Sequence, residues 1–180
     1  MLLLQFTGLS GSGKTTLANR VKLLLIDLGF PCEVLDGDEY RGTLCRDLGF
    51  TREDRKENNR RLGLLGLLLL KHGILVMIAT INPYEEDRRA LHSQSNKIFT
   101  IWLDCKVELL VRRDPKGLYR RAFLTPGQPE RIQNLTGIND PYEPPLHADL
   151  VIHTDRESPE ESAEKLLHFI LEKIGHDTAS

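Results

Sequence analysis

Apolar residues along this chain form short continuous runs that alternate with longer stretches in which they recur at helical spacing. The runs predict five buried strands, at residues 2–7, 32–35, 74–81, 98–103 and 150–152. The longer stretches predict helices at residues 14–29, 51–72, 84–93, 107–113 and from 158 to about 174. Because strands and helices alternate, we expect a parallel sheet with right-handed crossovers. The uniformly apolar strands predict helices on both faces of that sheet.

Two of these helices begin with residues that cap a helix N-terminus. Thr51 followed by Asp54, and Ser158 followed by Glu161, each fit a capping box, in which two side chains satisfy free backbone N–H groups. The most apolar stretch, residues 62–70, lies in the second half of one helix. Because that stretch is too short to span a bilayer, we expect a helix buried in the protein core.

The bulk composition restricts the classes of function. The chain has 180 residues and a formal net charge of −2, which fits a single domain over residues 1–180 and gives no support for nucleic-acid binding. The N-terminus lacks the basic region and cleavage site of a signal peptide, so we expect no leader and no membrane partner. Three distant cysteines, Cys32, Cys45 and Cys105, predict reduced thiols in a cytoplasmic protein, not a disulfide framework or a zinc site.

A glycine-rich loop between the first strand and the first helix carries the clearest chemistry. It matches the phosphate-binding pattern G-x-x-x-x-G-K-[ST] throughout, and its residues are Gly8, Leu9, Ser10, Gly11, Ser12, Gly13, Lys14, Thr15 and Thr16. Glycines let backbone N–H groups point at phosphate oxygens, and the helix adds its positive end. We expect Lys14 to contact the β- and γ-phosphates of ATP and the Thr15 hydroxyl to bind Mg²⁺.

This pattern also arises by chance, but here it follows a predicted strand and opens a predicted helix. We therefore predict an α/β fold of the P-loop NTPase type. It is a three-layer sandwich in which helices flank a five-stranded parallel sheet, with an additional lid region.

The phosphate-binding loop alone is compatible with a GTPase, a motor-type ATPase or a kinase. A GTPase should carry a guanine-reading Asn-Lys-x-Asp, which the chain lacks. A motor-type ATPase usually has an acid after an apolar strand, but the strand at residues 74–81 is followed by Asn82. The acids follow the second strand instead, at Asp36 and Asp38. Parallel sheets present ligands at the carboxyl ends of their strands, so this arrangement favours a small-molecule kinase.

Cationic and polar residues near these acids form a candidate site for an anionic acceptor. Arg41 follows Asp38 by three positions, and Arg55 and Asn58 share one face of the next helix. Together they could grip an anion, and Phe50 could stack on a base. Taken alone, Arg55 and Asn58 would suit a solvated helix face better, because charged residues surround them.

Residues 114–145 are rich in proline, glycine, arginine, asparagine and aspartate, with no sustained periodicity. A long irregular stretch inside a compact domain is more often functional than not. Because it begins with dense positive charge around Lys116, we predict a flexible basic lid that closes over the transferring phosphoryl group. A solvated surface loop is the alternative that charge alone leaves open.

Six motifs in this order resemble the adenylylsulfate kinase family and together cover nearly the whole chain. They are the glycine loop, Leu35-Asp36-Gly37-Asp38-x-x-Arg41, Leu48-Gly49-Phe50-Thr51-x-x-Asp54-Arg55-x-x-Asn58-x-Arg60-Arg61, Pro83-Tyr84-x-x-Asp87-Arg88, Arg113-Asp114-Pro115-Lys116-Gly117-Leu118-Tyr119 and Thr136-Gly137-Ile138-Asn139-Asp140-Pro141-Tyr142-Glu143-Pro144-Pro145. The glycine loop occurs in many enzymes, whereas the last two motifs are far more specific.

The resemblance implies a sulfate-assimilation enzyme that transfers the ATP γ-phosphate to the 3′-hydroxyl of adenosine 5′-phosphosulfate. It implies that Lys14, Asp38 and Arg41 are catalytic, that Asp38 helps to hold Mg²⁺ and accepts the hydroxyl proton, and that Arg113 joins the ATP site. The residues implied in acceptor binding are Asp38, Arg41, Phe50, Arg55, Asn58, Ile81, Asn82, Lys116, Asn134 and Leu135. The family also implies a homodimer.

The chain departs from the family pattern at named positions. Asn82 stands where many members have a serine, so a covalent serine route is excluded here and direct in-line transfer is favoured. Leu135 stands where a phenylalanine usually completes an adenine sandwich. A one-sided stack on Phe50 would lose part of the roughly 1–3 kcal/mol that base–aromatic stacking supplies. Residues 121–134 also make the lid longer than usual.

These departures leave two alternatives open. A related P-loop kinase acting on another nucleotide-linked anion would fit Asn82 and Leu135, and a preference for a pyrimidine acceptor would identify it. A nucleotide-binding module without turnover would fit Asn82 alone. The catalytic set of Lys14, Asp38 and Arg41 is complete, which favours an enzyme.

Overall fold

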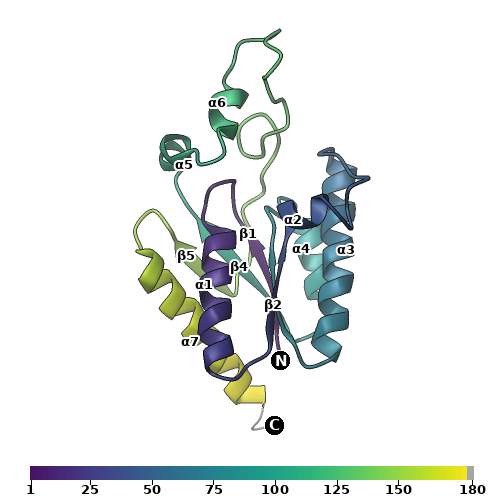
Figure 1. Ribbon diagram of the computed structural model, residues 1–180, viewed down its shortest axis with the longest axis vertical. Coiled ribbons are helices and arrows are strands. Elements are labelled where there is room, and N and C mark those ends of the chain that lie inside the picture. Colours follow the sequence, from purple (N-terminus) through teal and green to yellow (C-terminus); the bar gives the residue numbers. More distant parts are fainter. Residues whose placement is uncertain (178–180) are drawn as a thin grey trace.

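The computed structural model describes residues 1–177, in which a parallel sheet lies between two layers of helices (Figure 1). The strands are β1 (Leu3–Thr7), β2 (Cys32–Asp36), β3 (Leu75–Ala79), β4 (Ile98–Asp104) and β5 (Leu150–His153). They lie in the order β2-β3-β1-β4-β5, and each neighbouring pair is parallel. The predicted α/β fold and its five parallel strands are therefore confirmed.

The helices within residues 1–177 include every one that the periodicity predicts and two more. They are α1 (Lys14–Asp27), α2 (Gly37–Arg41), α3 (Arg52–Lys71), α4 (Glu85–His92), α5 (Val107–Arg113), α6 (Leu118–Ala122) and α7 (Pro159–Asp177). Both capping boxes form as predicted: Thr51 pairs with Asp54, and Ser158 with Glu161, each through two hydrogen bonds. The unpredicted α2 and α6 have five residues each, too few to show a helical period.

The sheet separates two apolar clusters. On one face, α1 and α7 pack against alternate residues of β1, with Leu4, Phe6, Val21 and Leu166 all fully buried. On the other face, α3 packs against the intervening β1 residue Leu3 and against β3, and α4 lies beside α3 (Figure 1). This is the three-layer arrangement that the apolar strands predict.

The sequence predicts that the apolar half of α3 is buried in the core, and this prediction is wrong for one side of the helix. Leu62 is fully buried, but Leu64 and Leu68 are 63% and 53% exposed. A helix in the outer layer of a sandwich has a solvent-facing side, and hydrophobicity alone does not indicate which leucines occupy it. The helix approaches the sheet closely at Gly66, where a Cβ atom would lie 2.8 Å from a methyl carbon of Leu3.

Residues 114–145, which we call the lid segment, lie above the carboxyl ends of the strands (Figure 1). The segment is more ordered than its composition predicts, because α6 and a small apolar cluster form within it. Tyr119 and Leu135 are buried in this cluster against Leu110 of α5, with Leu9 of the glycine loop packed beside them. The lid segment is therefore packed onto the loop that it covers.

Two predictions about bulk properties can be compared with the described residues. Cys32, Cys45 and Cys105 are all free and buried, so no disulfide joins them, as predicted. Burial raises the pKa of the Cys32 thiol to about 12. Among residues 1–177, no helix has both the length and the apolar character that crossing a bilayer requires.

Arg88 of α4 is a buried cation that joins three parts of the chain. Its side chain is 2% exposed and forms an ion pair with Glu85 at 2.7 Å. It donates to the backbone carbonyls of Asn82 and Glu143, both at 2.7 Å. Arg88 thus ties the end of the lid segment to the loop between β3 and α4.

We expect Arg88→Met to lower the free energy of unfolding by about 3–5 kcal/mol, because it leaves the buried partners of the guanidinium unpaired. Chemical denaturation measures the change. The matched control is Arg89→Met at the next, exposed position, where we expect a change within about 0.5 kcal/mol. Equal stability of the two variants would contradict this account of Arg88.

Candidate active site

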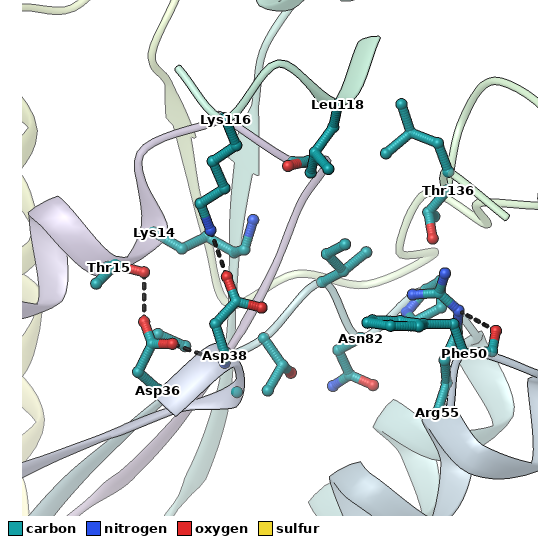
Figure 2. Close-up of a pocket in the computed structure, with 18 of the residues that line it drawn as sticks. Lys14, Thr15, Asp36, Asp38, Phe50, Arg55, Asn82, Lys116, Leu118 and Thr136 are labelled. Carbon is teal, nitrogen blue, oxygen red and sulfur yellow. Dashed lines mark hydrogen bonds and ion pairs between the residues drawn. The ribbon is translucent and has the colours of Figure 1, made fainter. Parts of the chain in front are cut away.

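A cavity of about 680 Å³ opens at the carboxyl ends of β1, β2 and β3, beneath the lid segment (Figure 2). It is lined by residues from both predicted half-sites, the phosphate-binding loop and the acceptor side. The predicted site residues in its wall are Ser10, Gly11, Gly13, Lys14, Thr15, Thr16, Asp38, Arg41, Phe50, Arg55, Asn58, Ile81, Asn82, Lys116, Asn134 and Leu135. Residues separated by up to 125 positions thus line the same cavity.

Four predicted ATP-site residues do not line this cavity: Gly8, Leu9, Ser12 and Arg113. The first three belong to the loop and accept hydrogen bonds from the Lys14 ammonium group. A Cβ atom at Gly8 would lie 2.6 Å from the carbonyl oxygen of Leu103, so only glycine fits there. Arg113 lies at the end of α5 and donates to the carbonyl of Thr154 at 3.0 Å.

The glycine loop has the backbone that phosphate binding requires. Gly11 and Gly13 have φ angles of 77° and 94°, in the left-handed region that favours glycine. The next residue, Lys14, begins α1, so the unpaired N–H groups of that helix face the cavity end of the loop. Because these groups carry partial positive charge, the loop is suited to bind an anion.

The ammonium group of Lys14 is buried inside the loop. It donates to the carbonyls of Gly8 and Leu9 at 2.9 and 2.7 Å and to the Ser12 hydroxyl at 3.3 Å. Burial lowers the pKa of Lys14 to about 7, with a smaller contribution from the positive charge of Lys116. All three partners are neutral, so this charge has no direct anionic partner among the described residues.

Two carboxylates lie beside the loop at the end of β2. The Thr15 hydroxyl donates to Asp36 at 2.5 Å, and the other oxygen of Asp36 caps α2 by accepting from two backbone N–H groups. Asp38 extends from α2 toward Lys116 of the lid segment, and the two form an ion pair (Figure 2). Carboxylate and hydroxyl oxygens and a cation of the lid segment therefore converge beside the glycine loop.

On the acceptor side, two arginines enclose an aromatic ring. The guanidinium of Arg41 lies 4.4 Å from the ring centre of Phe50, and that of Arg55 lies 5.6 Å from it. Burial and the nearby charge of Arg55 lower the pKa of Arg41, although a guanidinium remains protonated. This end of the cavity thus combines the apolar ring of Phe50 with the positive charges of Arg41 and Arg55. Such a combination suits a ligand that contains both a nucleobase and an anionic group.

Arg55 also holds the lid segment in place. It donates to the carbonyl of Asn134 at 2.6 Å and lies 3.3 Å from the carboxylate of Asp140. Asn58, one turn further along α3, is buried and lines the cavity, and its amide oxygen has no hydrogen-bond partner within residues 1–177. The predicted shared face of Arg55 and Asn58 is therefore a cavity wall, not a solvated surface.

Asn82 borders the cavity, but its side chain is engaged with the protein interior. Its amide nitrogen donates to Gln5 of β1 at 3.1 Å, and its amide oxygen accepts from Asn59 of α3 at 3.0 Å. The residue is 4% exposed and has a φ angle of 43°, a left-handed conformation that asparagine adopts more readily than most residues. A serine side chain is too short to reach both partners.

Thr136 of the lid segment is a wall residue to which sequence reasoning gave no role. It is fully buried, lines the cavity, and its hydroxyl has no hydrogen-bond partner among the described residues. Its only signal in the sequence is its position in the Thr-Gly-Ile motif. That motif marks the family but does not indicate what the side chain contacts.

Comparisons with known proteins agree with this geometry. The family model for adenylylsulphate kinase matches residues 1–153. The chain belongs to the adenylylsulfate kinase family. The adenylyl-sulfate kinase of Chloroflexus aurantiacus is 44% identical over 166 residues, covering 92% of this chain and 87% of the relative. The corresponding enzyme of Oceanobacillus iheyensis is 43% identical over 173 residues, covering 94% and 84%.

The similarity to this family includes the three-dimensional fold, as a comparison with a solved structure shows. The APS kinase of Mycobacterium tuberculosis, determined in complex with AMPPNP and APS, is 38% identical to the chain. The TM-score is 0.83, and the match covers 94% of this chain and 96% of that one. The predicted family, P-loop kinase fold and enzyme class are thereby confirmed.

We expect Asn82→Ser to lower the free energy of unfolding by about 1–3 kcal/mol, because it leaves the amides of Gln5 and Asn59 without their partner. Thermal or chemical denaturation measures the loss. Asn96→Ser, at an exposed turn, is the matched control and should be close to neutral. An unchanged stability of the Asn82 variant would show that its two side-chain hydrogen bonds contribute nothing.

Proposed function

We propose that this chain transfers the γ-phosphate of ATP to the 3′-hydroxyl of adenosine 5′-phosphosulfate, by direct in-line displacement. The observation that carries the proposal is the single cavity in which the phosphate-binding loop, Asp38 and the arginine pair around Phe50 face one another. Its two ends differ in chemistry, as a donor site and an acceptor site should. Membership of the family supports this acceptor over another nucleotide-linked anion.

The donor half is proposed to be the glycine loop, with the Lys14 ammonium on the β- and γ-phosphates. Its burial among neutral partners leaves this charge to be compensated by phosphate oxygens. The M. tuberculosis relative was determined with an ATP analogue, which supports ATP as the donor. Arg113 is proposed to extend the ATP site beyond the cavity.

The oxygen ligands beside the loop fit Mg²⁺, which favours carboxylates, hydroxyls and phosphate oxygens. Because the Thr15 hydroxyl donates its hydrogen to Asp36, its lone pairs stay free for a cation. We propose that Thr15 and Asp38 hold the ion and that Asp36 orients Thr15. When bound, the ion would neutralise charge on the β- and γ-phosphates.

The acceptor half is proposed to comprise Phe50 against the adenine, with Arg41, Arg55 and Asn58 on the phosphosulfate and ribose. Residues Ile81, Asn82, Asn134 and Leu135 would complete its wall. In the transfer step, the 3′-oxygen forms a bond to the γ-phosphorus and its proton passes to the Asp38 carboxylate. The bond from that phosphorus to the bridging oxygen breaks, and ADP leaves.

Asp38 pairs with Lys116 in the structure, so this proton transfer requires Lys116 to release it. We propose that the anionic acceptor draws the Lys116 ammonium onto its phosphosulfate, which frees the carboxylate and closes the lid segment in one movement. We further propose one kinase domain over residues 1–180 with residues 114–145 as its lid. The homodimer, the cytoplasmic setting and the absence of nucleic-acid and membrane partners stay predictions.

Purified protein with ATP and Mg²⁺ should form ADP only when adenosine 5′-phosphosulfate is present, and a coupled ADP assay measures this. We expect Lys14→Ala to reduce kcat by at least about 10²-fold, because it removes the charge nearest the migrating phosphoryl group. Lys22→Ala on the same helix, outside the cavity, is the control and should be near normal. Acceptor-independent ADP formation, or near-normal turnover of Lys14→Ala, would contradict the proposal.

Asp38→Asn separates proton acceptance from metal holding. An amide is a far weaker base than a carboxylate, so we expect kcat to fall by about 10²–10⁴-fold, with little change in ATP affinity. Isothermal titration with an ATP analogue and Mg²⁺ gives the affinity. Equal loss of turnover and of ATP binding would indicate a purely metal-holding residue.

A further inference from the structure

The unpaired hydroxyl of Thr136 is the starting point, because a buried polar atom without a partner is unusual and costly. A bound ligand can supply the partner that such an atom lacks. Thr136 lines the cavity wall across from Phe50 and Arg55 (Figure 2). Because Thr136 lies on the acceptor side, the acceptor is the ligand placed to pair with it.

Hydrogen bonds hold the backbone on both sides of Thr136. Leu135 donates its N–H to the Asn139 side chain at 2.8 Å, and Gly137 donates to the carbonyl of Asp140 at 2.7 Å. Arg55 anchors both ends of this turn through Asn134 and Asp140. A preformed turn therefore carries Thr136 in the cavity wall.

The other proposed contacts with the acceptor base do not distinguish one base from another. Stacking on Phe50 is available to every base, because each has a π-face, and the methyl groups of Leu135 add only apolar contact. Base identity is read by hydrogen bonds to base edges. A threonine hydroxyl both donates and accepts, so it can pair with a ring nitrogen or with an exocyclic amino group.

We infer that the Thr136 hydroxyl hydrogen-bonds the edge of the acceptor's adenine and is a residue that determines base specificity. The inference rests on the proposed function and deepens it. According to this inference, the hydrogen bond from Thr136 selects the base, next to Leu135, which offers no aromatic ring for stacking. The unpaired hydroxyl lowers the stability of the free protein, and acceptor binding relieves that cost.

The test compares Thr136→Val, which removes the hydroxyl at nearly constant shape, with Thr136→Ser, which retains it. Thr125→Val, a lid threonine outside the cavity, is the matched control. For each protein, kcat/KM is measured with adenosine 5′-phosphosulfate and with four analogues. These lack the 6-amino group, N1, N3 or N7. The KM for ATP and the thermal midpoint are measured alongside.

We expect Thr136→Val to lower kcat/KM for the adenosine acceptor about tenfold, with the ATP KM unchanged. This loss should vanish with the one analogue that lacks the paired group, because the hydrogen bond is then absent from both proteins. The thermal midpoint should rise or stay equal, since a costly unpaired hydroxyl is removed. Thr136→Ser and Thr125→Val should behave like the unsubstituted protein.

The result that overturns the inference is undiminished acceptor use by Thr136→Val, or a loss that is the same for all five acceptors. A fall in the thermal midpoint with Thr136→Val would also overturn it, because the hydroxyl would then have a structural partner. If the unsubstituted protein phosphorylates adenosine 5′-phosphosulfate in the same assay, only the role of Thr136 fails. Absence of that activity would overturn the proposed function and this inference with it.

Discussion

The rest of the site depends on the buried ammonium of Lys14. The loop encloses this cation with neutral oxygens only, and burial lowers its pKa to about 7. The free protein thus holds a charge that its own structure compensates poorly, at the point where α1 also presents unpaired N–H groups. An anion placed there gains from both, so this corner of the fold is suited to bind phosphate.

The positive charge of Lys14, which lacks a direct anionic partner among the described residues, also connects the donor site to the lid segment. Lys116 adds to the positive charge around Lys14 and is held near it by Asp38. Tyr119 donates to the carbonyl of Ser10 at 2.9 Å, so the lid segment is fastened to the loop itself. At its far end Arg88 binds the backbone of Glu143. The lid segment is therefore fastened at both ends of the cavity, to the glycine loop through Tyr119 and to α4 through Arg88.

The sequence predicts those features that local rules determine. Capping side chains such as Thr51 and Ser158 satisfy backbone groups within one turn, so they are visible without the fold. Apolar runs give the strands for the same reason. The five-residue helices are too short to show a period, and the pairing of Asn82 with Gln5 joins residues 77 positions apart. The Thr136 hydroxyl lacks a partner within residues 1–177 because of how distant segments pack around the cavity, and a local sequence pattern cannot show this.

The departures from the family pattern at positions 82 and 135 have different physical consequences. At position 82 the longer side chain reaches into the interior and joins the loop after β3 to β1 and α3 through Gln5 and Asn59. A side chain that links two elements of the interior therefore stands where the family pattern has a small hydroxyl group. At position 135 the substitution changes the wall, because Leu135 is packed into the lid cluster and offers methyl groups where a ring would stack. Since apolar contact does not discriminate between bases, selectivity at this wall must come from a neighbouring hydrogen-bonding group.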